Sequence, residues 1–444
     1  MDKNQVLLAP EAEAYVESLS IFDVTEIGSP RWLQQHEYVE KLNMQAMCNA
    51  LQNEDEFIKE FLITYEKLNV LVADLIIIDL WKAKVFPKLL KNLNENGQTF
   101  PFYFILYHEL TVVNLLETVL YHQNSCEAVS EVSLDLIDYC YNKLTKLQSI
   151  GHYCEGKEND ASKDKYKEVN TTTSEELMKQ NKKIDFMVAL KSLTILRFMI
   201  ENLEVISLSA TKRILNDLDV PILFVHLLEN PPWLCTHMKQ HMKHDGTEWR
   251  PAAGEEFYKI SKVEGQVWIG LFQLLVTKVR NNYEFNSYRK STLLKLRPML
   301  NDFILDQMPV LIELQRFLDQ LSIFEPEPPK SALIIEQLPE IKNTYLQKYR
   351  GKWANIAKDQ ESKYFSSSSE NFQKLAKNLS EIYSFENLEN FIEEPAKCAL
   401  CGEPSTKKCS RCHNEWYCRR ECQVNHWQKH KKACDLICGG AGSS

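Results

Sequence analysis

The chain has 444 residues, 44% of them hydrophobic and 25% charged, with a formal net charge of −9 at pH 7. This is the profile of an ordinary globular protein with room for about three domains or one long repeat-like body. An acidic body repels phosphate, so nucleic acid is excluded as a partner.

The N-terminal residues MDKNQVLLAP lack the basic region and long apolar core of a signal peptide. The strongest apolar run, Leu75 to Ile78, lies between Asp74 and Asp79 and is too short to span a bilayer. Five cysteines lie outside the C-terminal region, as expected for buried free thiols in a reducing compartment: Cys48, Cys126, Cys140, Cys154 and Cys235. We therefore expect a soluble cytoplasmic protein that does not insert into membranes.

Residues 10 to about 323 read as one helix after another, with few strand signals. Two sets of apolar residues mark two faces of one predicted helix, namely Leu106, Leu110, Val113 and Leu120, and Val112, Leu115 and Val119. A helix that is apolar on two faces is covered on both sides, as in stacked layers. No strict repeat period is present. We therefore expect an irregular armadillo- or HEAT-like α-solenoid over residues 1–325, with a generic helical domain as the alternative.

Two interruptions divide the chain further. Residues 154–183 are polar and charged, which predicts a mobile loop. The EPEPP stretch at 325–329 ends one helical region, and residues 326–395 are predicted to form a helical arm leading to the C-terminal segment. Within this arm, Ser367 and Glu370 have the spacing of a capping box.

Two stretches of the body are candidate sites. One contains Cys235, His237, His241 and His244 in PPWLCTHMKQHMKHDG, which is chelating spacing if the segment is helical. The neighbouring prolines and Asp245-Gly246 favour a solvated helix–loop edge instead, and metal binding there stays open. The other, Gly254 to Tyr258 (GEEFY), faintly resembles an element of SET-domain methyltransferases. The Asn-His-x-Cys element of such enzymes is absent, and so are Gly-x-Ser-x-Gly and Walker A motifs, so we expect a binding protein rather than an enzyme.

The C-terminal segment from Cys398 to Cys434 has the spacing C-x2-C-x7-C-x2-C-x5-C-x3-C-x7-H-x3-C. Each pair places two ligands on one turn, and four pairs supply two closed tetrahedral sites, which predicts two structural Zn²⁺ ions. Spacing alone does not distinguish an interleaved from a sequential use of the pairs. We place the finger at 396–436 and a flexible tail at 437–444.

This segment resembles the MYND-type zinc finger, which ends in Cys-Gln, His-Trp and His-x3-Cys. The resemblance implies an interleaved arrangement, with Cys398, Cys401, Cys418 and Cys422 on the first zinc and Cys409, Cys412, His430 and Cys434 on the second. It leaves His426, His413 and Cys438 as bystanders. Fingers of this family bind short proline-containing peptides, and by position Gln423 and Trp427 are candidates to line that groove. Trp416 is a further candidate because a small finger leaves aromatics exposed, unless it packs against the C-terminal arm.

Across the whole chain, several sequence segments resemble those of a family of MYND-finger proteins that act as axonemal dynein assembly factors. They are QQHEYVEKLNMQA (34–46), DLWKAKVFP (79–87), EGQVWIGLF (264–272), LLKLRPML (293–300) and RGKWANIAK (350–358). The resemblance implies a cytoplasmic co-chaperone, found also near the centrosome or the base of the cilium. Its implied partners are a leucine-rich-repeat assembly factor bound through the finger, the heat-shock chaperone machinery, and dynein arm chains as clients. The alternative is a nuclear transcriptional corepressor adaptor. The lack of a basic nuclear-localisation run counts against this alternative.

Overall fold

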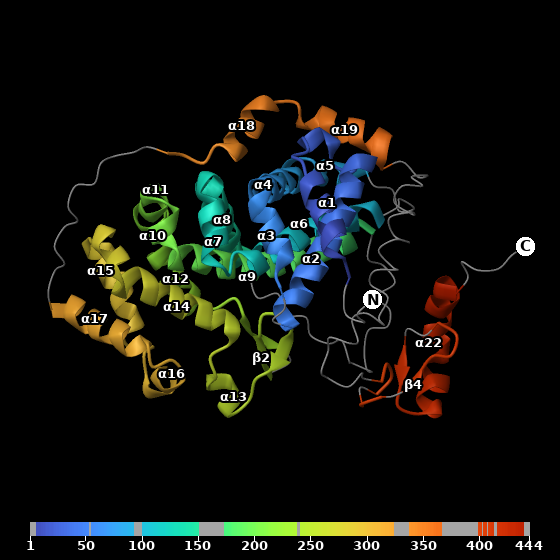
Figure 1. The fold of residues 1–444 in the computed structure, drawn as a ribbon. Coiled ribbons are helices and arrows are strands. Elements are labelled where there is room, and N and C mark those ends of the chain that lie inside the picture. Colours follow the sequence, from blue (N-terminus) through green and yellow to red (C-terminus); the bar gives the residue numbers. More distant parts are fainter. Residues whose placement is uncertain are drawn as a thin grey trace, which may run out of the picture. The chain divides into compact units, whose positions relative to one another are not determined.

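The structure is a computed structural model that describes residues 6–52, 55–92, 100–150, 173–237, 240–323, 337–365 and 398–438, apart from 402, 406, 413 and 414. Two compact units share these residues, a larger one within Ala9–Gln373 and a smaller one that contains the finger. The described part is mainly helical, as predicted (Figure 1). Within it, no helix combines the length and the apolar character needed to cross a membrane.

The first half of the larger unit consists of α-helices and two short 3₁₀ helices. In order these are α1 (Ala9–Ser18), η1 (Val24–Glu26), α2 (Pro30–Gln52), α3 (Phe57–Thr64), α4 (Leu68–Lys84), α5 (Phe86–Asn92), α6 (Phe100–Val119), α7 (Gln123–Ala128), η2 (Ser130–Val132), α8 (Ser133–Ile150) and α9 (Thr173–Glu201).

The second half contains shorter elements and a small sheet. These are α10 (Leu203–Ile206), α11 (Leu208–Lys212), the π-helix η4 (Arg213–Asp217), α12 (Val220–Glu229), β1 (Leu234–His237), β2 (Gln240–His244), β3 (Trp249–Pro251), α13 (Glu255–Tyr258), α14 (Lys262–Val276), η5 (Lys278–Asn282), α15 (Ser287–Leu293), η6 (Leu294–Leu296), α16 (Asp302–Gln307), α17 (Leu311–Ile323), α18 (Ile341–Lys348) and α19 (Trp353–Tyr364).

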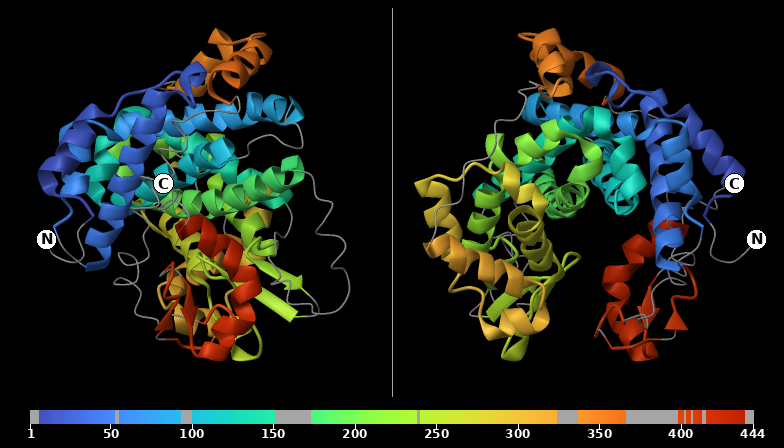
Figure 2. Two further views of the ribbon diagram at one scale, coloured as in Figure 1. Left: turned by 90° about the vertical axis from the view of Figure 1, so that its right-hand side faces the viewer. Right: turned by 60° about the vertical axis from the view of Figure 1, so that its left-hand side comes forward.

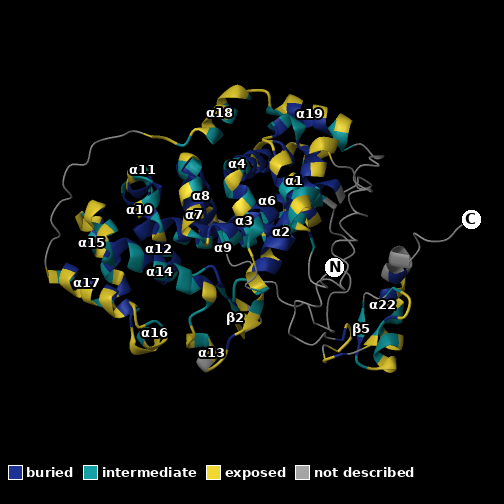
Figure 3. Cartoon of the chain, viewed as in Figure 1, coloured by how far each residue is buried: buried dark blue, intermediate teal, exposed yellow. Residues whose placement is uncertain are grey.

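The long helices pack on one another in succession. Helix α6 contacts α2 and α4 as well as α9, and α9 in turn contacts α8 and α14, while α14 contacts α12 and α17. Both predicted faces of α6 are buried, including Leu106 and Val113 on one and Val112 and Leu115 on the other. The two-sided apolar pattern of this helix is therefore explained by neighbours on both sides, and Figure 3 shows α4 and α6 mostly buried.

A network of buried charges joins three of these helices. Glu109 of α6 accepts hydrogen bonds from Lys82 Nζ of α4 and Lys143 Nζ of α8, each at 2.5 Å, and from Tyr139 Oη at 2.7 Å. Lys143 also contacts Asp79 at 2.6 Å. Burial opposes ionisation of Glu109, but the two lysines outweigh it and hold the pKa of this carboxyl far below its usual range.

Helix α18 is attached to the body by its ends. The Asp135 carboxylate accepts hydrogen bonds from the backbone N–H groups of Glu340 at 3.2 Å and Ile341 at 3.0 Å, at the start of the helix. At the other end, Lys348 Nζ and Tyr349 Oη each lie 2.6 Å from an oxygen of Asp23. These contacts fix α18 against the first 135 residues of the chain.

Helix α19 is attached by a buried amide. Gln360 accepts a hydrogen bond from Trp81 Nε1 and donates one to the carbonyl of Val24, both at 2.8 Å. Just after the helix, the ring of Phe365 stacks on Phe102 with centroids 4.9 Å apart. In the ribbon views α18 and α19, in orange, lie against the blue N-terminal helices (Figures 1 and 2). We expected residues 326–395 to form an arm, but their described helices belong to the larger unit.

Two further expectations differ from the structure. Residues 173–183 of the predicted loop are the start of α9, since Leu177 and Ile184 are buried and give the polar stretch an apolar anchor. The rest of that loop, the EPEPP stretch, and the Ser367–Glu370 spacing lie outside the described residues. The segment 234–251, expected to be helix or loop, is a three-stranded antiparallel sheet in the order β1-β2-β3.

Candidate metal centre

The finger consists of a small hairpin and a helix. Strand β4 (Lys407–Lys408) pairs antiparallel with β5 (Trp416–Tyr417), and α22 (Arg420–Cys438) follows. The backbone N–H of Cys398 donates to the carbonyl of Glu403 at 2.8 Å, and that of Cys409 donates to Glu415 at 2.8 Å. These bonds close tight turns around each Cys-x2-Cys pair, which is how the local sequence directs two thiols toward one point.

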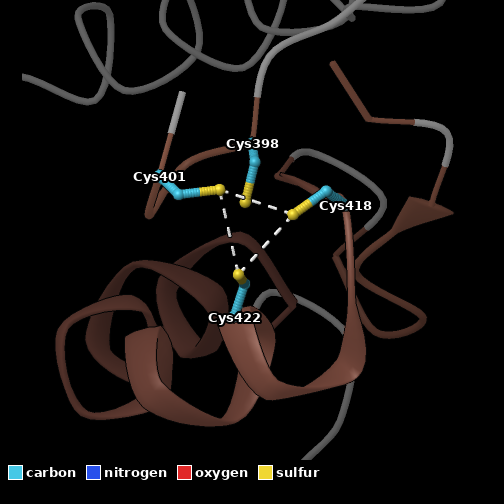
Figure 4. Close-up of side chains that lie close together, drawn as sticks. All are labelled: Cys398, Cys401, Cys418 and Cys422. Carbon is cyan, nitrogen blue, oxygen red and sulfur yellow. Dashed lines mark hydrogen bonds between the residues drawn. The ribbon is translucent and has the colours of Figure 1, made fainter. Parts of the chain in front are cut away.

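Four cysteines form the first candidate site: Cys398, Cys401, Cys418 and Cys422 (Figure 4). The Sγ atom of Cys401 lies 3.4 Å from that of Cys418 and 3.9 Å from that of Cys422, and the last two are 3.6 Å apart. A zinc ion with four thiolates at about 2.3 Å has sulfur–sulfur edges of about 3.8 Å. The four sulfur atoms are therefore arranged as zinc requires.

The second candidate site contains Cys409, Cys412, His430 and Cys434, whose ligand atoms all lie within 4.8 Å of one another. The Nε2 atom of His430 is 3.4 Å from Cys412 Sγ, close to the edge of about 3.6 Å expected around zinc for one nitrogen and one sulfur. His430 and Cys434 are buried, so this site is shielded from water. Each site offers four protein ligands, so the two sites fit two structural Zn²⁺ ions.

Successive ligand pairs along the chain belong alternately to the first and the second site. The spacing alone did not distinguish this arrangement from a sequential one. The first site takes its ligands from before β4, from Cys418 directly after β5, and from α22, and the second takes them from the β4–β5 turn and from α22. Cys422 and His430 are eight residues apart on α22, about 12 Å along its axis. One helix thus spans both sites and ties them into a single small fold.

Backbone donors prepare two of the thiols for metal. Burial opposes ionisation of Cys398, but N–H groups of Cys418, Cys401 and Leu400 outweigh it and lower its pKa to about 6. The same balance, with N–H groups of Cys412 and Arg411 as donors, lowers the pKa of Cys409 to about 6. Because the thiolate is the metal-binding form, these N–H groups stabilise the form of Cys398 and Cys409 that binds zinc.

Tyr417 fills the small interior between the sites. It is fully buried, its Oη lies 3.0 Å from Nδ1 of His426, and its ring packs against His430. His426 is therefore a packing residue, as expected, and not a metal ligand. His413 lies outside the described residues, and Cys438 lies on α22.

The candidate peptide-binding residues are partly exposed. Gln423 and Trp427 are one helical turn apart on α22, and Trp427 packs beside the second site with its ring centroid 5.9 Å from that of His430. The ring of Trp416 lies under Lys408 Nζ at 4.7 Å. Two exposed apolar residues were missed from the sequence, Val424 and Leu400. Neither stands out in a sequence, since exposure of a single apolar residue has no local signal.

The Cys235 cluster is not assembled as a site. In the β1–β2 pair Cys235 faces Met242 and Thr236 faces His241, so His241 and His244 project to opposite faces. His241 contacts Thr236 Oγ1 at 3.2 Å, and His244 is buried beside Phe186 and Trp249. Among the described residues, only the two finger sites bring metal ligands together.

The expected free thiols are present at Cys48, Cys126 and Cys140, which are buried. Cys235 is instead disulfide-bonded, so the prediction was wrong for this residue. Cys154 lies outside the described residues.

Comparison with known proteins agrees with this geometry. The family model described as the MYND finger matches residues 398–434. Two ubiquitin carboxyl-terminal hydrolases of Arabidopsis thaliana, numbers 19 and 17, are 43% and 39% identical over 44 residues, which is 10% of this chain and 6% of each relative. These short matches leave nine tenths of this chain without a counterpart in those relatives. No solved structure matches the chain.

A helical body with a C-terminal cross-braced finger that fits two zinc ions defines a MYND-type zinc-finger protein. The zinc finger MYND domain-containing protein 10 homolog of Drosophila melanogaster is 34% identical over 451 aligned positions, covering 96% of this chain and 98% of the relative. The chain belongs to the family of zinc finger MYND domain-containing protein 10.

Proposed function

We propose that this protein is a non-enzymatic adaptor for the cytoplasmic preassembly of axonemal dynein arms, which motile cilia need. The observation that carries the proposal is similarity along almost the whole chain to one family, body and finger together. Similarity limited to the finger would give little information about the function of the helical body. Closed zinc sites support the non-enzymatic part, because four protein ligands leave no position for water or substrate.

In this proposal the finger binds a leucine-rich-repeat assembly factor. The groove is formed by Gln423 and Trp427 of α22, with Trp416 at its margin. Partly exposed aromatics on a rigid zinc-bound frame suit an extended peptide, since little of the frame must be ordered on binding.

The helical body binds the heat-shock chaperone machinery and dynein arm chains as clients. The successive packing of α2, α6, α9 and α14 supports the interpretation of this body as an irregular armadillo- or HEAT-like α-solenoid. Solenoids offer extended surfaces that suit partly folded clients. The protein would then hold an assembly factor and a client at the same time.

The proposal is tested by separating the two activities in cells that assemble motile cilia. A chain of residues 1–373, cut where the larger unit ends, is expected to capture chaperone or client but not the leucine-rich-repeat partner. The full chain with Cys409→Ala is expected to behave in the same way, because it keeps the body and loses the second zinc site.

Bridging is tested by supplying residues 1–373 and 374–444 as two unlinked chains. Dynein arms are expected to be missing, because only the linked chain brings both partners together. Full rescue by the unlinked halves would refute the adaptor mechanism. Nuclear accumulation with binding of corepressor peptides would favour the corepressor alternative.

A further inference from the structure

Two aromatic side chains lie exposed and stacked where α13 meets α16. Tyr258 and Phe303 are 60% and 65% exposed, and their ring centroids are 5.7 Å apart with an interplanar angle of 22°. Isolated exposed apolar residues are ordinary, whereas a stacked pair from two elements forms a contiguous apolar surface. Figure 3 shows α16 largely exposed. We call this surface, Tyr258 with Phe303, the aromatic patch.

The patch is held rigid by one glutamine. Gln307 Oε1 accepts a hydrogen bond from the backbone N–H of Ile260 at 2.8 Å, and its Nε2 donates to the carbonyls of Tyr258 at 3.2 Å and Phe303 at 2.8 Å. The amide therefore fastens the end of α13 to α16. A surface that is ordered before binding loses little conformational entropy when a partner docks.

The margin of the patch is acidic. Asp302 and Asp306 lie one residue before and three residues after Phe303, are exposed, and form no ion pair with any described residue. The segment NDFILDQMPVLI, residues 301–312, contains these two acids and no basic residue. On the α13 side, Glu256 is paired with Lys259 and adds no net charge. Unneutralised acids beside exposed rings favour a cationic partner.

We propose that the aromatic patch docks a basic amphipathic helix of a partner protein. An apolar side chain of that helix packs on the rings of Tyr258 and Phe303. Lysine or arginine side chains beside it lie within reach of Asp302 and Asp306 and of the ring faces. Val310 and Ile312, 43% and 38% exposed where α16 leads into α17, provide further apolar surface close by in the chain. This inference does not depend on dynein assembly or on the finger.

The test uses the full zinc-loaded protein and a defined probe, an 18-residue fluorescein-labelled peptide of leucine and lysine with a leucine stripe along one helical face. Fluorescence anisotropy is expected to show saturable binding. Tyr258→Ser with Phe303→Ser should weaken it at least tenfold. Asp302→Asn with Asp306→Asn should weaken it several-fold at low salt and little at high salt, because screening removes the charge contribution.

Matched controls separate the patch from the general acidity of the chain. Leu208→Ser removes an apolar side chain that is 78% exposed elsewhere and should leave binding unchanged. Glu127→Gln with Glu204→Gln removes two exposed charges from other helices and should also leave binding unchanged. A leucine–glutamate peptide of the same pattern should not bind. Failure of the leucine–lysine peptide to bind, or equal binding by the Tyr258→Ser, Phe303→Ser protein, would overturn the proposal.

Discussion

Replacing Glu109 by glutamine tests how the centre of the body is held together. In the folded protein this carboxylate is fully buried and is shared by Lys82 and Lys143, whose side chains are 6% and 5% exposed. Glutamine keeps the shape and removes the charge. Each ammonium then keeps one carboxylate, Asp185 for Lys82 and Asp79 for Lys143, and loses its most buried partner.

The expected loss is about 3–5 kcal/mol of unfolding free energy at pH 7, because two desolvated ammonium groups lose the carboxylate they share and each keeps only one partner. That is a large share of the roughly 5–15 kcal/mol typical of a domain. The matched control is Glu256→Gln, which breaks an exposed pair with Lys259 and should cost no more than about 0.5 kcal/mol.

The assay is urea unfolding followed by tryptophan fluorescence, since Trp32, Trp81, Trp233 and Trp268 are buried in the larger unit. The pKa of Glu109 is lowered by folding, so its contribution is present above the unfolded pKa of about 4.3 and is lost as pH falls toward the folded pKa. The difference between wild type and variant should therefore shrink by about 1.4 kcal/mol per pH unit below pH 4. A difference under about 1 kcal/mol at pH 7, or one that does not change with pH, would refute this reasoning.

Three further predictions concern the finger and one helix contact. Purified protein should contain two zinc ions per chain by metal analysis, and Cys409→Ala should unfold the finger while the thermal transition of the body stays nearly unchanged; a shared transition would contradict this. Trp427→Ala should weaken partner binding by more than about 1 kcal/mol with zinc content intact, while Lys431→Glu should alter mainly the association rate, and the reverse pattern would exclude an apolar groove. Gly270→Ala should destabilise the body by about 1–3 kcal/mol, since its Cβ would lie 2.5 Å from Phe224 Cε2. Gly265→Ala in the same helix meets only an ordinary contact at 3.9 Å and should be neutral or stabilising in the same urea titration.

The finger was predictable because its information is local. Each ligand pair is coded by a spacing of two or three residues, so Cys409 and Cys412 identify a chelating turn without any knowledge of the fold. The helices of the body were predictable for a similar reason, since their periodicity is read within a window of roughly 11–18 residues. The interleaving of the pairs was not local, and only the family resemblance supplied it.

The features that were missed depend on residues far apart in the chain. Glu109 meets Lys82 and Lys143 across three helices, and no window of sequence contains all three. The hairpin around Cys235 was missed because its histidine spacing also suits a helix, and strand pairing decides between the two. Polar residues 173–183 are helical because α9 is anchored further along by Ile184 and its neighbours.

The attachment of α18 and α19 limits how far the finger can travel from the body. Cys398 follows the anchored Phe365 by 33 residues, so whatever the conformation of that segment, the two are never more than about 120 Å apart. If the chain left the body at Ile323, 75 residues would give a limit of about 270 Å. The accessible volume is thus roughly tenfold smaller, so the local concentration of the finger around the body is correspondingly higher. Breaking the hydrogen bonds of Gln360 with Trp81 and Val24 would raise this limit without changing any residue of the finger.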